Sequence, residues 1–162
     1  LREDGRIQID DPAMIKIEPG SGDKHRLRPG NVVVASKGSR ATAAVFESTI
    51  PTVAGGQFFV IKLKTGRLLP AYLRWYLNLP ETQARLMESA RGSFVQAIPI
   101  AAMREFEIQL PPPEIQHQIV TLHELHNEEQ RLLKLIAEKR SQLIQIQIAN
   151  LAAGKIKPNP AG

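Results

Sequence analysis

One segment constrains the fold more than any other, because Glu114–Ala153 contains neither proline nor glycine. These two residue types destabilise a helix interior most strongly. Ile115, Ile119 and Leu122 step by four and then three residues, which is the spacing of a coiled-coil seam. The pattern predicts one helix within 111–152, on the order of 55–60 Å long at about 1.5 Å per residue. Such a helix is longer than a small domain is wide, so another helix must cover its apolar stripe.

The expected seam is apolar at both ends and polar in the middle. Burial of each large aliphatic side chain stabilises by about 1.5–3 kcal/mol before entropy is subtracted, and exposed stripes of this size mark interfaces. The simplest cover is a second copy, antiparallel about a two-fold axis, although a missing part of a longer chain is the alternative. The expected interface residues are Ile115, Ile119, Leu122, Leu125, His126, Glu129, Leu133, Ile136 and Leu143.

The residues before 111 have a mixed pattern. Short alternating or β-branched apolar runs at 5–9, 13–17, 31–36, 42–47, 57–63 and 106–110 predict strands. Residues 69–78 have helical spacing, Pro80 opens a second helix, and Gly92 would end it. The predicted fold class is α+β: a small β-rich domain over 1–110, one long C-terminal coiled-coil helix over 111–152, and a tail over 153–162. Because the sequence begins with Leu1 and not Met, we expect its N-terminus to be truncated.

Charge and composition narrow the function. Lys and Arg total 21 against 16 Asp and Glu, for a net charge of +5, and this excess favours an anionic partner, nucleic acid before membrane. The absence of cysteine excludes disulfides, thiol nucleophiles and cysteine-based zinc sites. No apolar run approaches the roughly 18 residues of a membrane span. These features predict a cytoplasmic protein with no membrane association.

Catalytic motifs are sparse. His123 and His126 lie three residues apart on the expected helix, which permits two metal ligands on one face. We interpret them instead as one seam residue and one exposed residue. No phosphate-binding loop, dinucleotide fingerprint or amino-methyltransferase signature is present. We therefore expect a protein that is not an enzyme and that has no cofactor and no metal.

Four motifs occur in a characteristic order: "LRPGNVVVASKG", "LPAYLRWYLNLPETQ", "RGSFVQAI" and "FEIQLPPPEIQHQIV". Together they resemble the specificity subunits of type I restriction–modification systems. The last motif fits the family pattern I-x-L-P-P-x-x-x-Q-x-x-I, which leads into a long helix. Asn31 stands where the family commonly has Asp. A full specificity subunit has two target recognition domains and two spacer helices, and this chain has one of each.

The resemblance implies a target recognition domain that reads one half of a bipartite site in double-stranded DNA. Its helix would set the distance to a second domain, and it would dock methyltransferase subunits and the restriction subunit. Two alternatives stay open. The chain can be the recognition domain of a fused restriction–methyltransferase enzyme, or a coiled-coil decoy that imitates specificity subunits without binding DNA.

Basic and polar loop residues are the candidates for DNA contact, because phosphates attract Lys, Arg and hydroxyls while base edges need Arg, Gln and similar groups. For each loop, a solvated turn or an ordinary helix stop is the alternative. In the loop that contains Arg91, we expect Phe94 to lie in the core. On the helix expected at 69–78, we expect Trp75 and Tyr76 to be packing residues. If either of these two is exposed, it would dock a methyltransferase subunit. The candidates are Lys24, Arg26, Arg28, Lys37, Ser39, Arg40, Arg91, Ser93 and Gln96.

Overall fold

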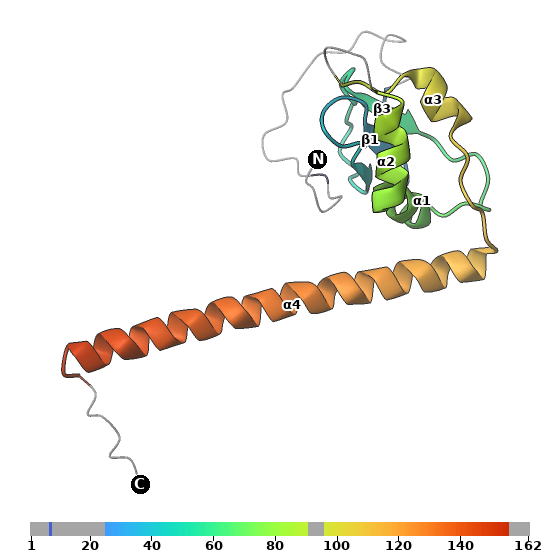
Figure 1. Ribbon diagram of the computed structural model, residues 1–162. Helices are drawn as coiled ribbons and strands as arrows, with labels where there is room; N and C mark the ends of the chain where they lie inside the picture. The colour runs from blue at the N-terminus through green and yellow to red at the C-terminus, as the bar shows by residue number, and fades with distance from the viewer. Residues whose placement is uncertain (1–6, 8–24, 91–95, 156–162) are drawn as a thin grey trace. The chain divides into compact units, whose positions relative to one another are not determined.

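The structure is a computed structural model, which describes residues 7, 25–90 and 96–155. It divides into two units, Leu1–Val120 and Thr121–Gly162. Within its described residues, the first unit contains a three-stranded sheet, three short helices and the first turns of a long helix. The second contains the rest of that helix. This arrangement confirms the predicted α+β class with a long C-terminal helix (Figure 1).

The sheet is antiparallel in the order β2-β1-β3. Its strands are β1 (Val32–Ala35), β2 (Ala43–Val45) and β3 (Phe58–Ile61). In the centre, Val33 lies opposite Ala44 on one side and Val60 on the other. The strands predicted at 31–36, 42–47 and 57–63 are thus confirmed. The runs at 5–9 and 13–17 lie outside the described residues, apart from Ile7.

Both faces of the sheet are covered, because side chains alternate along each strand. Val32 and Val34 point to one face, where they pack in a core cluster with Leu73 and Leu77. Val33 points to the other face and packs with Phe46. The helices that cover the first face are α1 (Pro70–Asn78) and α2 (Pro80–Glu88) (Figure 1).

Proline opens both of these helices. Pro70 and Pro80 occupy the first helical positions, where the missing N–H would have no partner within the helix in any case. The two helices expected in this region are confirmed. The second ends at Glu88, before Gly92, which lies outside the described residues.

The strand predicted at 106–110 is wrong. Residues 106–112 belong to no strand, and the preceding Ile100–Glu105 forms a helix, α3, that the sequence pattern did not indicate. The apolar alternation has another cause, because Phe106 and Ile108 pack against the core from an extended segment. The backbone of this segment is bonded elsewhere: the Tyr72 hydroxyl donates to the Gln109 carbonyl at 2.9 Å.

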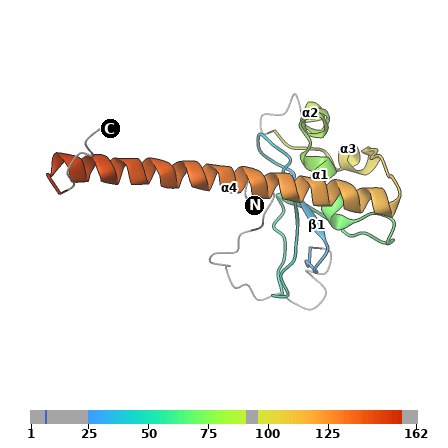
Figure 2. The same cartoon turned by 90° about the horizontal axis from the view of Figure 1, so that it is seen from below.

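The long helix, α4, spans Pro113–Ala152 without a break (Figure 2). It ends in a Schellman motif, in which the Gly154 N–H donates to Leu151 O and the Lys155 N–H to Asn150 O. Gly154 has a φ of +66°, which glycine adopts without steric cost. None of the helices in the described part of the chain is long and apolar enough to cross a bilayer.

Candidate nucleic-acid interface

Two of the predicted DNA-contact loops lie side by side. The turn after β1 is joined to residues 96–98 because the Gly38 N–H donates to Gln96 O at 3.0 Å, and the Ile98 N–H donates to Ser36 O at 2.8 Å. Lys37 and Ala97 form an isolated antiparallel bridge. The pair carries four exposed polar side chains, and we call it the paired-turn surface: Lys37, Ser39, Arg40 and Gln96.

Gly38 fixes the shape of this surface. Its φ is +113°, a backbone conformation that L residues with a side chain rarely adopt. Apart from its neighbours in the chain, no atom of the described residues lies within 4 Å of the position that a Cβ would occupy. The requirement for glycine therefore comes from the backbone and not from lack of space.

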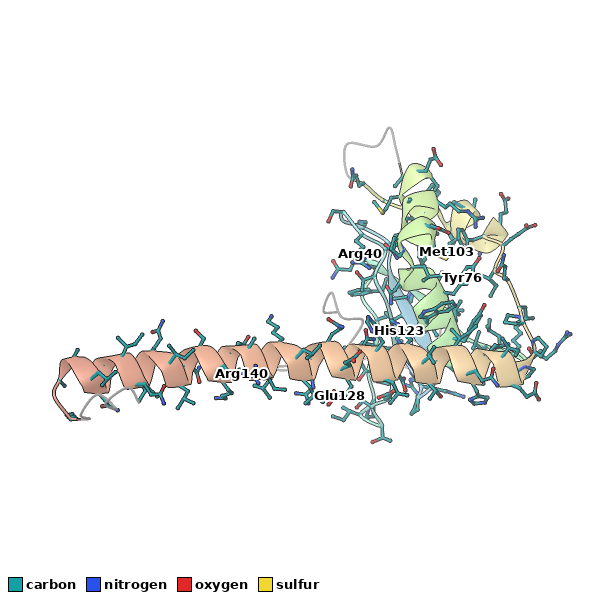
Figure 3. All side chains as sticks on the ribbon, turned by 60° about the horizontal axis from the view of Figure 1, so that its bottom comes forward. Arg40, Tyr76, Met103, His123, Glu128 and Arg140 are labelled. Carbon is teal, nitrogen blue, oxygen red and sulfur yellow. The ribbon has the colours of Figure 1, made fainter. Side chains whose placement is uncertain are left out.

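Arg40 is held at the C-terminal end of α1. Its Nη2 donates to Asn78 O at 3.3 Å, where the helix dipole favours a cation. A guanidinium has five N–H donors, so the bond to Asn78 O leaves other donors for a ligand. Figure 3 labels the side chain on its loop.

The segment beneath the paired-turn surface, from Ala41 to Ala43, is held by two side-chain amides that bond to its backbone on the outer edge of the sheet. Asn78 Oδ1 accepts from the Ala43 N–H at 3.0 Å, and its Nδ2 donates to Ala43 O at 2.8 Å. The Gln83 amide makes the same two bonds to Ala41 at 2.9 Å each. The edge of β2 is thus closed to another strand, and the chain that leads from Arg40 into β2 is fixed.

Other predicted contact residues lie elsewhere. Arg26 and Arg28 precede β1, whereas Lys37 follows it, so the four-residue strand lies between them, which spans roughly 13 Å at about 3.3 Å per residue. Lys24, Arg91 and Ser93 lie outside the described residues. The structure thus brings together the candidates at one end of β1 only.

The turn that carries Arg28 is well ordered by its own bonds. The Asn31 N–H donates to Arg28 O at 3.0 Å, and Asn31 Oδ1 accepts from the Arg28 N–H at 2.9 Å. An Asp at position 31 would supply the same acceptor, which explains why Asn can stand there. The exposed Lys62 and Lys64 directly follow β3 at this end of the sheet. Neither lysine was among the predicted contact residues, since Lys62 lay within the strand predicted at 57–63 and Lys64 directly after it.

The expected interface residues of α4 are mostly exposed. Leu122 has 71% of its surface accessible, Ile119 is half-buried, and His126 and Glu129 are exposed. The exposed apolar series continues past Leu143 through four residues outside the predicted interface: Ile144, Ile146, Ile148 and Leu151. Glu128 and Arg140, both labelled in Figure 3, mark the polar middle of the helix.

No metal site was found in the described part of the chain, where no three His, Cys, Asp or Glu residues gather suitably. His123 Nε2 lies 2.9 Å from Asn127 Nδ2, and His126 Nδ1 lies 3.8 Å from Glu129 Oε2. The two histidines therefore have separate partners along the helix.

Gln116 anchors α4 to the first unit. Its side chain is fully buried: Oε1 accepts from the Leu69 N–H at 2.9 Å, and Nε2 donates to Arg67 O at 2.7 Å and Pro111 O at 2.8 Å. Three backbone groups of two loops are thus bonded by one amide. Gln116 is the glutamine of the motif FEIQLPPPEIQHQIV, and its role as an anchor was not predicted from the sequence.

Comparison with known proteins identifies one family. Residues 13–144 match the family described as "Type I restriction modification DNA specificity domain". No curated protein gives a significant match. The family match spans the sheet, the helices, the paired-turn surface and most of α4.

Proposed function

The chain belongs to the type I restriction modification DNA specificity domain family, and on that premise we propose that it is a half-subunit that reads one half of a bipartite DNA site. The family match agrees with the resemblance carried by the four motifs. In this role the chain recognises duplex DNA in the cytoplasm and performs no catalysis itself. Companion methyltransferase and restriction subunits supply the chemistry.

The observation that carries this proposal is the paired-turn surface. Two segments almost sixty residues apart in sequence place two cations, a hydroxyl and an amide on one exposed patch. Lys37 and Arg40 suit phosphate oxygens, whereas Gln96 suits the edge of an adenine. The backbone that carries Arg40 is already fixed by the Asn78 and Gln83 amides. Less conformational entropy is therefore lost when DNA binds. The surface therefore combines positioning groups with a group able to distinguish bases.

The second half of the site requires a second recognition domain, and α4 supports a homodimer. Between Pro113 and Gln130 the helix has four Glu and no Lys or Arg; between Arg131 and Ala152 it has four Lys or Arg and one Glu. Antiparallel pairing of two copies sets the acidic half of each helix against the basic half of the other, whereas parallel pairing sets like charges together. Together with the exposed apolar stripe, this charge pattern favours the antiparallel pair.

The test combines the purified chain with a candidate methyltransferase subunit and genomic DNA, followed by sequencing of the methylated positions. We expect methylation at a two-part sequence with a spacer of constant length, and none from the methyltransferase subunit alone. A complex that forms but retains no DNA and directs no methylation would favour the decoy instead.

A further inference from the structure

A groove with aromatic walls lies within the first unit, between α1, α2 and the first turns of α4. It encloses about 710 Å³. Its apolar side is formed by three aromatic side chains, four aliphatic ones and a proline, and its polar side by Glu81, Thr82, Arg85 and Gln109. The residues that the argument uses are Tyr72, Trp75, Tyr76, Arg85, Ile115 and Ile119.

The groove wall is held in place by contacts among its own residues. The ring centroids of Tyr72 and Trp75 lie 5.4 Å apart, and those of Trp75 and Tyr76 lie 6.3 Å apart. The Tyr72 hydroxyl donates to Gln109 O, and burial, and secondarily the neighbouring Tyr76, raise the pKa of Tyr72. Arg85 lies over the Phe106 ring at 4.7 Å. A wall of packed rings offers apolar area without further ordering, which suits an aliphatic ligand.

The groove is continuous with the apolar stripe of α4. Ile115 and Ile119 line the groove and also begin the stripe. Near the other end of the helix, three exposed residues return to the same face. Viewed down the axis, they lie within about 60° of Ile115 at about 100° per residue: Ile144, Ile148 and Leu151.

These positions are related by symmetry about the middle of the helix. Leu133 lies at the centre of the forty residues of α4. A two-fold axis there sets Leu151 of one copy opposite Ile115 of the other, and Ile148 close to Ile119. We propose that the aromatic groove receives the C-terminal turns of α4 from a second copy of this chain. The inference rests on the antiparallel dimer of the proposed function. It adds a docking groove for the partner's helix at each end of that dimer.

The occupant is a second copy because the segment matches the groove in chemistry and position. The helix from Leu143 to Leu151 has no charged residue, which suits the aromatic and aliphatic side of the groove. The acidic and basic halves of α4 also direct this end of one copy toward the first turns of the other. A methyltransferase subunit in the groove is the competing outcome.

A contact quencher tests the contact directly. The sequence has one tryptophan, Trp75, and no cysteine, so Gln147→Cys accepts a single bimane label, a dye that tryptophan quenches on contact. Within one chain Gln147 and Ile119 are 28 residues apart on one helix, about 42 Å at about 1.5 Å per residue, so quenching must occur between copies. We expect at least a twofold loss of bimane emission, which Trp75→Phe restores.

The matched control carries the label at Gln142→Cys, on the opposite face of the same region, and we expect no tryptophan-dependent quenching there. Sedimentation of the same labelled samples separates the failures. A dimer without quenching at position 147 overturns the groove contact and leaves the dimer intact, whereas a monomer overturns both. A second measurement needs no label. In the Ile148→Glu variant we expect the emission maximum of Trp75 to lie at longer wavelength than in the wild type, because the groove would lose its occupant and Trp75 would be exposed to water. If the dimer shows no quenching, and only the methyltransferase subunit shifts the Trp75 emission, then the groove binds that subunit. This result overturns the proposal.

Discussion

Gly38 ties the paired-turn surface to a single backbone conformation. Replacing it with Ala forces a Cβ into a φ of +113°, at a cost of about 1–3 kcal/mol. We expect Gly38→Ala to lower the free energy of unfolding by that amount in urea titrations and to weaken DNA binding. Gly55→Ala is the matched control, because its Cβ would also meet nothing within 4 Å and its φ is not positive. Equal stability of the two variants would contradict the assigned role of the backbone.

Lys37 and Arg40 are the cations of that surface. We expect the double change to Ala to weaken duplex binding and to reduce the slope of log affinity against log salt by about 0.9 for each lost phosphate contact. Fluorescence anisotropy at several salt concentrations measures both quantities. Changing Arg104 and Lys155 to Ala removes the same charge from exposed positions outside this surface. If the two double variants bind alike, the assignment of the surface is wrong.

Sequence patterns identified these residues as basic or polar loop residues. They did not show which of them lie next to one another in the fold. Lys37 and Gln96 were separate candidates, and only the backbone bonds between their segments show that they share one surface. Arg28 had the same local signals, yet β1 separates it from them. Such long-range pairing depends on tertiary packing, which local charge and turn patterns do not encode. Whether any of the nine candidates contacts DNA stays a prediction.

At the scale of the element, we expect the free energy of unfolding to depend strongly on Gln116. Gln116→Met keeps the size of the side chain but leaves the Leu69 N–H and two carbonyls without their partner. An unsatisfied buried group costs about 1–3 kcal/mol, so we expect destabilisation of at least that size in urea denaturation followed by circular dichroism. Gln145→Met changes an exposed glutamine of the same helix and should have little effect. A stable Gln116→Met variant would show that water replaces the amide.

Elements with strong local periodicity were predictable, and those shaped by their neighbours were not. β1 and α4 follow directly from a β-branched run and a long helical pattern. Residues 106–110 alternate as a strand does, yet the alternation reflects packing of Phe106 and Ile108 on the core. The helix α3 has six residues, and only Ala102 and Met103 pack against the core, so its apolar pattern is too short to recognise in the sequence.

At the scale of the whole molecule, the proposed dimer depends on the middle of the α4 stripe. We expect Leu122→Glu with Ile136→Glu to convert the dimer to a monomer, because both changes bury charge in the seam. Analytical ultracentrifugation at tens of micromolar measures this. Gln142→Glu with Gln145→Glu adds the same charge away from the stripe and should leave the dimer intact. A wild-type chain that sediments as a monomer would point to a partner helix from another polypeptide.

In the proposed dimer, the unbroken course of α4 would make the distance between the two half-sites change in fixed steps. Insertion of seven residues lengthens the helix by about 10.5 Å and returns the stripe to nearly the same face. Since base pairs rise by about 3.4 Å, we expect an insertion of one heptad near Leu133 to move the two halves of the methylated sequence about three base pairs further apart, as sequencing would detect. Insertion of two residues would rotate the stripe away and abolish pairing. Descendants of this chain could thus acquire new target spacings only in discrete increments, while the bases read at either end remained the same.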